Sequence, residues 1–185
     1  MGEYSSLVLT TSDVAGSRFS LESAVEALHS RILQTGAGSV VMVGLSVGAM
    51  MATRYAAAYP DAVAGLLLSG SQVRPNPVMM GVQRAIMGLL PARMLPLPED
   101  LNKRQFLEVL DAAGKADLRD DLAQITVPTL VLCGSRDLAN IPAAKTIAAA
   151  LPDAELRIIA GGGHELNTGA PEDFAHAVED LLART

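Results

Sequence analysis

The chain has 185 residues and a formal net charge of −6 at pH 7, and half of its residues are hydrophobic although only 3% are aromatic. This length suits one domain with an extended core, so we expect residues 1–185 to form a single domain. The acidic balance, without a basic stripe, disfavours nucleic acid and anionic membrane surfaces as partners. No run approaches the roughly 18 apolar residues of a membrane-spanning helix, so we expect a soluble, cytoplasmic protein.

The first half of the chain predicts alternating strands and helices. Residues 7–10 are an apolar, β-branched run closed by polar residues, which predicts a buried strand and then a loop. Ser20 can cap a helix whose apolar residues recur at spacings of four and three, with Gly36 beyond its end. Residues 40–43 and 63–68 predict two further strands, with a helix between them that ends near residues 59 and 60.

The second half continues the alternation after one interruption. Residues 129–133 and 156–160 predict strands, and residues 142–151 and 171–182 predict helices. Together these elements predict an α/β fold with a mostly parallel sheet of about five strands and helices on both faces. Because the first strand would lie at an open edge of this sheet, we expect an N-terminal cover or a homodimer that pairs the edges.

Residues 72–117 break the alternation and are interpreted as a short helical cap inserted into the domain. The segment holds five prolines, two helical patches and four of the eight methionines. Methionine suits an adaptable apolar pocket, so Met79, Met80 and Met87 are candidate substrate-binding residues. The alternative is a helical connection that packs on the sheet, for which methionine is equally suitable.

The pentapeptide from Gly44 to Gly48, Gly-Leu-Ser-Val-Gly, is the strongest functional motif. A β-branched run leads into it and a helical segment follows, which predicts a strand, a sharp turn and a helix with Ser46 on the turn. Such an elbow presents the serine hydroxyl at the edge of the sheet, and both glycines are expected to be required because side chains would strike the neighbouring strand and helix.

A serine needs a base to become nucleophilic, and the base needs a carboxylate to orient it. Of the three histidines, only His164 lies on a loop after a predicted strand, behind three glycines that give the loop freedom to move. Asp137 follows the strand at 129–133, at the edge where catalytic groups gather in open α/β sheets. Glu165 is a weaker candidate because a neighbouring side chain usually points the other way.

In these residues the chain resembles the α/β-hydrolase family. The elbow at Ser46, the strand and turn that lead to Asp137, and Gly163 with His164 follow the family's order of serine, acid and histidine. The resemblance spans nearly the whole chain, weakly in the cap, and implies an abbreviated hydrolase fold. Relatives carry three further N-terminal strands and a loop that helps to form the oxyanion hole, and these are not found here.

The oxyanion hole is therefore the part of the site in which the sequence departs from the family. The Val47 N–H, at the start of the elbow helix, is one expected donor. If the strand at residues 7–10 lay beside the strand that leads to Ser46, the backbone of Thr11 or Ser12 could provide the second donor.

These residues predict a serine hydrolase that cleaves small carboxylic esters through an acyl-enzyme, with no metal or organic cofactor. The resemblance leaves lactones, thioesters, carbon–carbon bonds and peptides open as substrates. The alternative is a shortened, weakly active or non-catalytic relative that serves as a ligand-binding or interaction module.

Overall fold

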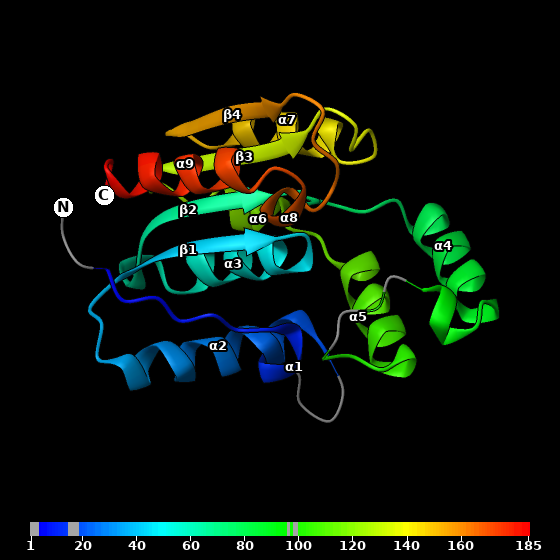
Figure 1. The fold of residues 1–185 in the computed structure, drawn as a ribbon. Helices are drawn as coiled ribbons and strands as arrows, with labels where there is room; N and C mark the ends of the chain where they lie inside the picture. The colour runs from blue at the N-terminus through cyan, green and yellow to red at the C-terminus, as the bar shows by residue number, and fades with distance from the viewer. Residues whose placement is uncertain (1–3, 15–18, 96, 98–99) are drawn as a thin grey trace.

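A parallel four-stranded sheet forms the centre of the described part of the protein (Figure 1). The structure, a computed structural model, describes residues 4–14, 19–95, 97 and 100–185. The strands lie in chain order and are β1 (Val40–Leu45), β2 (Val63–Ser69), β3 (Thr129–Gly134) and β4 (Ala154–Ile159). The predicted α/β class with a mostly parallel sheet is confirmed.

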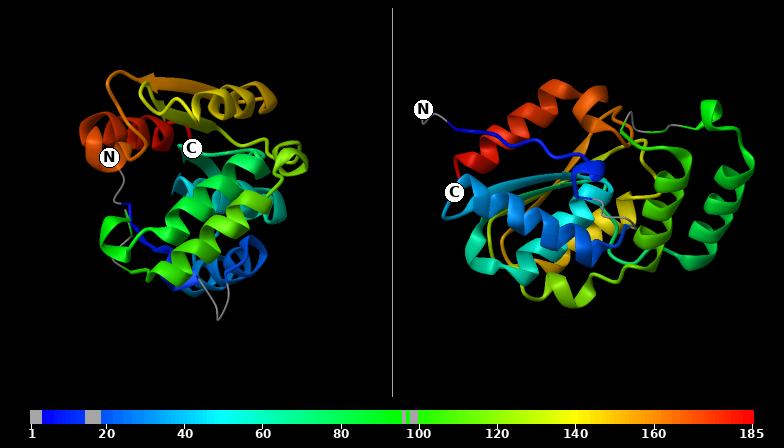
Figure 2. Two further views of the ribbon diagram at one scale, coloured as in Figure 1. Left: turned by 90° about the vertical axis from the view of Figure 1, so that its right-hand side faces the viewer. Right: turned by 90° about the horizontal axis from the view of Figure 1, so that it is seen from below.

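Helices cover both faces of this sheet (Figure 1 and Figure 2). On one face, α2 (Leu21–Thr35), α3 (Val47–Ala58) and α7 (Ile141–Ala150) bury apolar side chains against the strands. On the other face, the short α8 (Leu166–Gly169) and α9 (Pro171–Leu182) pack on β2 and β3. Because β2 and β3 are covered on both sides, they are continuous apolar runs rather than alternating ones.

Local signals in the sequence explain where α2 begins and ends. The Ser20 hydroxyl accepts a hydrogen bond from the Ser23 N–H, and the Ser23 hydroxyl accepts one from the Ser20 N–H, so the first turn is capped reciprocally. At the other end Gly36 takes the left-handed conformation with φ of 74°, which glycine adopts without steric cost. The predicted N-cap and C-terminal glycine are both confirmed.

The prediction of a strand at residues 7–10 is wrong. Residues 4–10 have no regular structure, Leu7 and Val8 are exposed, and the chain continues into the four-residue helix α1 (Thr11–Val14). A strand needs a partner for its backbone N–H and C=O groups, and among the strands that the structure describes β1 pairs with β2 alone. Among the described strands β1 and β4 form the two edges of the sheet, and the N-terminal cover or homodimer inferred from an open edge stays a prediction.

In residues 72–95, 97 and 100–117 the structure describes two α-helices, α4 (Pro77–Leu89) and α5 (Lys103–Lys115), and the short 3₁₀ helix η2 (Ala92–Met94). They lie side by side beyond the carboxyl ends of the strands (Figure 2). α5 buries Val109 and Ala113 against the domain, whereas α4 has no buried residue and packs on α5 through Met80. The cap interpretation itself stays a prediction.

Two short elements complete the connections between strands. They are η1 (Pro60–Ala62), which leads into β2, and α6 (Arg119–Leu122), which precedes β3. Within the described ranges, no helix combines the length and apolar character needed to cross a membrane.

Candidate active site

The elbow holds Ser46 in a backbone conformation that L residues rarely adopt. Its φ of 55° is the only positive φ among the described non-glycine residues, and α3 begins at the next residue, Val47. The Ser46 N–H donates a 2.8 Å hydrogen bond to the carbonyl of Ser69 at the end of β2. This bond fixes the serine backbone at the carboxyl edge of the sheet, and the strain is typical of functional turns.

The two glycines of the motif are not equivalent. A Cβ on Gly44 would lie 2.6 Å from the Ala49 Cα and 2.6 Å from the Gly48 carbonyl oxygen, so Gly44 is required for β1 and α3 to approach each other. A Cβ on Gly48 would meet no atom within 4 Å. The prediction that both glycines avoid a clash is therefore right for Gly44 and wrong for Gly48, which faces open space in this structure.

Asp137 and His164 lie together although 27 positions separate them in the chain. Asp137 lies on the turn after β3 and His164 on the loop after β4. The His164 Nδ1 lies 2.8 Å from Asp137 Oδ2, which makes this nitrogen the donor to the carboxylate. The Asp137 side chain is 8% exposed and that of His164 is 42% exposed, so a buried acid orients an accessible imidazole. The remaining nitrogen, Nε2, is then the one that can accept a proton.

The end of β2 brings this pair beside the elbow. Gly70 has a φ of +59°, and a Cβ there would lie 2.9 Å from His164 Cε1 and 3.0 Å from His164 Nδ1. The imidazole therefore lies against Gly70, while the preceding residue, Ser69, accepts the hydrogen bond from Ser46. Among the described residues no hydrogen bond joins the Ser46 hydroxyl to His164, and such catalytic hydrogen bonds often tighten only when substrate binds.

Hydrogen bonds hold the glycine loop before His164 in place. The Gly161 N–H donates to Ser135 Oγ at 2.8 Å, and the Arg136 N–H donates to the Gly162 carbonyl at 2.9 Å. A Cβ on Gly134 would lie 2.2 Å from the Gly163 oxygen and 2.3 Å from the Gly162 oxygen. Gly134 thus lets the two backbones pack closely, and a Cβ on Gly162 would lie 2.5 Å from Leu166 Cδ2, whereas Gly161 and Gly163 face open space. The freedom expected of the glycine loop stays a prediction.

Asn140 and Gln72 belong to the same site and were missed in the sequence. The Asn140 Nδ2 lies 2.8 Å from each carboxylate oxygen of Asp137 and 3.1 Å from His164 Nδ1. The Gln72 Nε2 donates in turn to Asn140 Oδ1. An Asn three residues after Asp137, at the start of α7, was the only available signal, and nothing in the spacing pointed to Gln72.

Thr11 and Ser12 do not reach the elbow by the predicted route. Both lie in α1, and no strand from residues 7–10 runs beside β1 to bring them there. The Ser12 N–H donates to Asp100 Oδ2 at 3.1 Å, so this amide already has an acceptor. Val47 directly follows Ser46 at the start of α3, and the role of the Thr11 and Ser12 backbone as an oxyanion donor stays a prediction.

The three candidate methionines differ in their surroundings. Met79 is exposed, while Met80 and Met87 are half-buried, and all three lie on α4. Met80 packs against Gly114 of α5, where its Cβ would lie 3.1 Å from a Cβ on that glycine. Met80 therefore helps to join the two helices of the segment.

The other two histidines are not at the site. His29 stacks on Tyr59 with ring centroids 3.8 Å apart, and its Nδ1 lies 3.0 Å from the Tyr55 hydroxyl. His176 is exposed on α9. Glu165 is also exposed, and among the described residues its carboxylate makes no hydrogen bond to His164.

Cys133, at the end of β3, is no competing nucleophile. Its side chain is fully buried, and burial together with the Asp137 charge raises the pKa of the thiol to about 11. Because the thiolate is the reactive form, we expect Cys133 to resist a thiol reagent such as dithionitrobenzoate at pH 8 in the folded protein and to react within seconds in denaturant. Fast labelling of the native protein would contradict this assignment.

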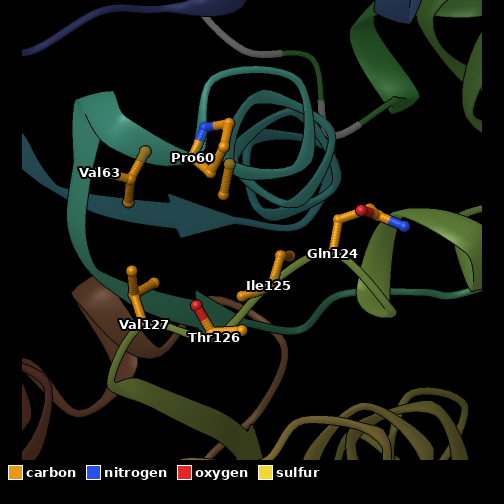
Figure 3. Close-up of a pocket in the computed structure, with 7 residues that line it drawn as sticks. Pro60, Val63, Gln124, Ile125, Thr126 and Val127 are labelled. Carbon is orange, nitrogen blue, oxygen red and sulfur yellow. The ribbon is translucent and has the colours of Figure 1, made fainter.

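Two hollows in the described part of the protein lie away from Ser46. A crevice of about 10 Å³ lies between the end of α3 and the starts of β2 and β3 and has room for about one water molecule (Figure 3). Ser46 follows the other, carboxyl end of a parallel strand, so the crevice is at the opposite end of the sheet. A cleft of about 560 Å³ lies between the start of α2 and α5, and its cations Arg54 and Lys115 pair with neighbouring acids. Among the described residues, no three His, Cys, Asp or Glu side chains are placed to hold a metal ion.

Comparison with known proteins identifies the family. The model of the alpha/beta hydrolase family matches residues 9–177, so the chain belongs to this family. A relative from Escherichia coli O127:H6, RutD, is named as a candidate carbamate hydrolase and is 25% identical over 88% of this chain and 73% of its own length. The comparisons thus support a hydrolase.

Solved structures show the same fold at low identity. An alpha/beta hydrolase enzyme, MGS-M2, from a Medee basin deep-sea metagenome library superposes with a TM-score of 0.80 at 18% identity, covering 91% of this chain and 74% of that one. An esterase from Exiguobacterium antarcticum superposes with a TM-score of 0.77 at 17% identity, and the match covers 87% of this chain and 73% of the esterase chain. The chain is thus shorter than these relatives, which agrees with the predicted abbreviated fold.

Proposed function

We propose that this protein is a serine hydrolase that cleaves small carboxylic esters with Ser46, His164 and Asp137 as its catalytic triad. The single observation that carries the proposal is the buried Asp137 carboxylate bonded to His164 Nδ1, on an imidazole packed against Gly70 beside the elbow serine. A carboxylate, an imidazole and a strained serine at one edge of a parallel sheet are the parts that acyl transfer needs.

Each group has one task in the reaction. The Ser46 Oγ forms a bond to the ester carbonyl carbon while its proton passes to His164 Nε2, and Asp137 accepts the Nδ1–H and stabilises the imidazolium. The carbonyl oxygen, now negative, is bound by the Val47 N–H at the start of α3. The proton then passes from His164 to the departing alcohol, and a water molecule, activated by the same imidazole, releases the acid from Ser46.

The comparisons support hydrolysis of a carbonyl compound without selecting the bond. One structural neighbour is named an esterase and one sequence relative a candidate carbamate hydrolase. Esters and carbamates share the carbonyl that Ser46 would attack, so both belong in the first substrate screen. In this proposal the segment at residues 72–117 acts as the cap, and Met79, Met80 and Met87 provide apolar surface toward the acyl group.

Hydrolysis should fall as the pH drops. A general base must be neutral to accept a proton, and histidine side chains ordinarily become protonated near pH 6.5. We therefore expect kcat/KM for a nitrophenyl ester to be constant above about pH 7.5 and to decrease about tenfold per pH unit well below pH 6. Nitrophenyl esters of increasing acyl length, with a nitrophenyl carbamate beside them, would measure this profile and the substrate preference together. A rate that is flat from pH 5 to 9 would contradict a histidine base.

A non-catalytic binding module is the second candidate function. It is favoured by the open β1 edge and by the Ser12 amide, which donates to Asp100 rather than toward Ser46. A fluorophosphonate distinguishes the two, because it reacts only with a serine that a base activates. A module would remain unlabelled.

A further inference from the structure

We propose that Asn140 is a positioning residue that holds the Asp137 carboxylate against His164, and that Gln72 fixes the orientation of Asn140. The inference rests on the proposed function for its kinetic consequences, but its effect on His164 can be measured without any substrate. Neither residue is part of the triad.

Asn140 lies in the interior of the site and not on the exposed surface. It is buried, at 8% exposure, and its Nδ2 lies 2.8 Å from both Asp137 Oδ1 and Asp137 Oδ2. Its backbone N–H also donates to the Asp137 carbonyl at 3.0 Å. The Asn140 amide, at the start of α7, therefore contacts both oxygens of the Asp137 carboxylate.

The contact between Asn140 Nδ2 and His164 Nδ1, at 3.1 Å, joins two donors. Nδ1 already donates its hydrogen to Asp137 Oδ2, so it has no lone pair free for the amide. The two N–H groups converge on one carboxylate, and the positive end of the amide dipole faces the ring. Asn140 and His164 therefore share the Asp137 carboxylate, and the amide limits how far the carboxylate can turn away from the imidazole.

Gln72 determines which way the Asn140 amide points. The Gln72 Nε2 donates to Asn140 Oδ1 and, at 3.3 Å, to the carbonyl of Ala139. With Oδ1 turned to this donor, Nδ2 is turned to the carboxylate. Gln72 lies three residues after Ser69, on the segment that leads from β2 to α4. Hydrogen bonds therefore connect this segment, through Asn140, to Asp137.

The other titratable groups near Asp137 and His164 do not hold the Asp137 carboxylate as Asn140 does. The buried Cys133 thiol lies 3.9 Å from the Asp137 carbonyl, and burial raises its pKa, so it stays neutral. Arg136 and Glu165, the chain neighbours of the pair, are exposed, and their charges are screened by solvent.

Four variants test the proposal, with two measurements on each. In Asn140→Ala we expect the His164 pKa, followed by NMR of the ring and assigned by its loss in His164→Ala, to rise, because the Asp137 carboxylate loses both hydrogen bonds from the amide. Asn140→Asp places a second carboxylate there and should raise it further, whereas Gln72→Ala should give a smaller rise. The control Gln34→Ala removes an exposed amide side chain near the end of α2, outside the segment at residues 72–117, and should leave the His164 pKa unchanged.

The kinetic readout should follow the same order. In Asn140→Ala the acid limb of the kcat/KM profile moves to higher pH with the pKa, and kcat falls by roughly tenfold with little change in KM, because the pair is less well positioned rather than lost. A thermal melt of each variant separates this effect from unfolding. An active wild type with an unshifted His164 pKa and unchanged kcat in Asn140→Ala would overturn the inference alone. A wild type without hydrolysis would overturn the proposed function, while the NMR titration would still decide the role of Asn140.

Discussion

Replacing Ser46 with alanine is expected to reduce ester hydrolysis by at least about 10⁴-fold, since loss of a catalytic serine removes the covalent route altogether. The variant keeps the backbone elbow, the Val47 N–H and the Asp137–His164 pair, so only the residual rate from binding and oxyanion stabilisation should remain. Its folding should be close to that of the wild type, because among the described residues no hydrogen bond depends on the Ser46 hydroxyl. Steady-state hydrolysis of a nitrophenyl ester at pH 8 measures the loss.

Ser30→Ala is the matched control for this experiment. Ser30 is exposed on α2, and within the described ranges its hydroxyl donates one hydrogen bond, to the Glu26 carbonyl one turn earlier, so its removal should leave the rate within twofold of wild type. A Ser46→Ala protein that retains a tenth or more of the wild-type kcat would rule out Ser46 as the nucleophile.

Replacing Gly134 with alanine is expected to cost both activity and stability. The added Cβ would lie 2.2 Å and 2.3 Å from the carbonyl oxygens of Gly163 and Gly162, and backbone cannot move aside as a flexible side chain can. The loop that carries His164 must therefore shift, and a displacement of about 1 Å at a catalytic group costs on the order of 100-fold in rate. Overpacking of this kind also lowers the free energy of unfolding by roughly 1–3 kcal/mol.

Gly163→Ala provides the comparison on the same loop. A Cβ at Gly163 meets no atom within 4 Å, so this variant should keep most of the activity and the stability although it lies beside His164. Denaturant unfolding and ester hydrolysis of the two variants measure both effects. Equal behaviour of the two variants would show that close backbone packing does not position His164.

The sequence predicted the elements whose limits are encoded locally. The Ser20 cap and Gly36 define α2, and the helix at residues 171–182 has the bounds of α9. The strand at residues 7–10 failed because an apolar run becomes a strand only when a neighbouring strand accepts its hydrogen bonds. That partner is a property of the assembled sheet and not of the run itself.

The candidate site likewise contains residues that local signals predict and residues that only long-range contacts define. Ser46, Asp137 and His164 could be selected because each follows a recognisable strand and parallel strands end at one edge. Gly70, Asn140 and Gln72 could not, because their roles depend on contacts between side chains and backbone that lie far apart in the chain. The open surroundings of Gly48 and the hydrogen bond from Ser12 to Asp100 likewise depend on tertiary packing, which the spacing of apolar residues in the sequence does not predict.

Covalent labelling with a fluorophosphonate, followed by peptide mass mapping, tests most directly whether His164 activates Ser46. The account predicts one adduct in the wild type, on the peptide that contains Ser46, and its absence after denaturation or in His164→Ala. An unlabelled native protein, an adduct on another residue, or undiminished labelling of His164→Ala would contradict it.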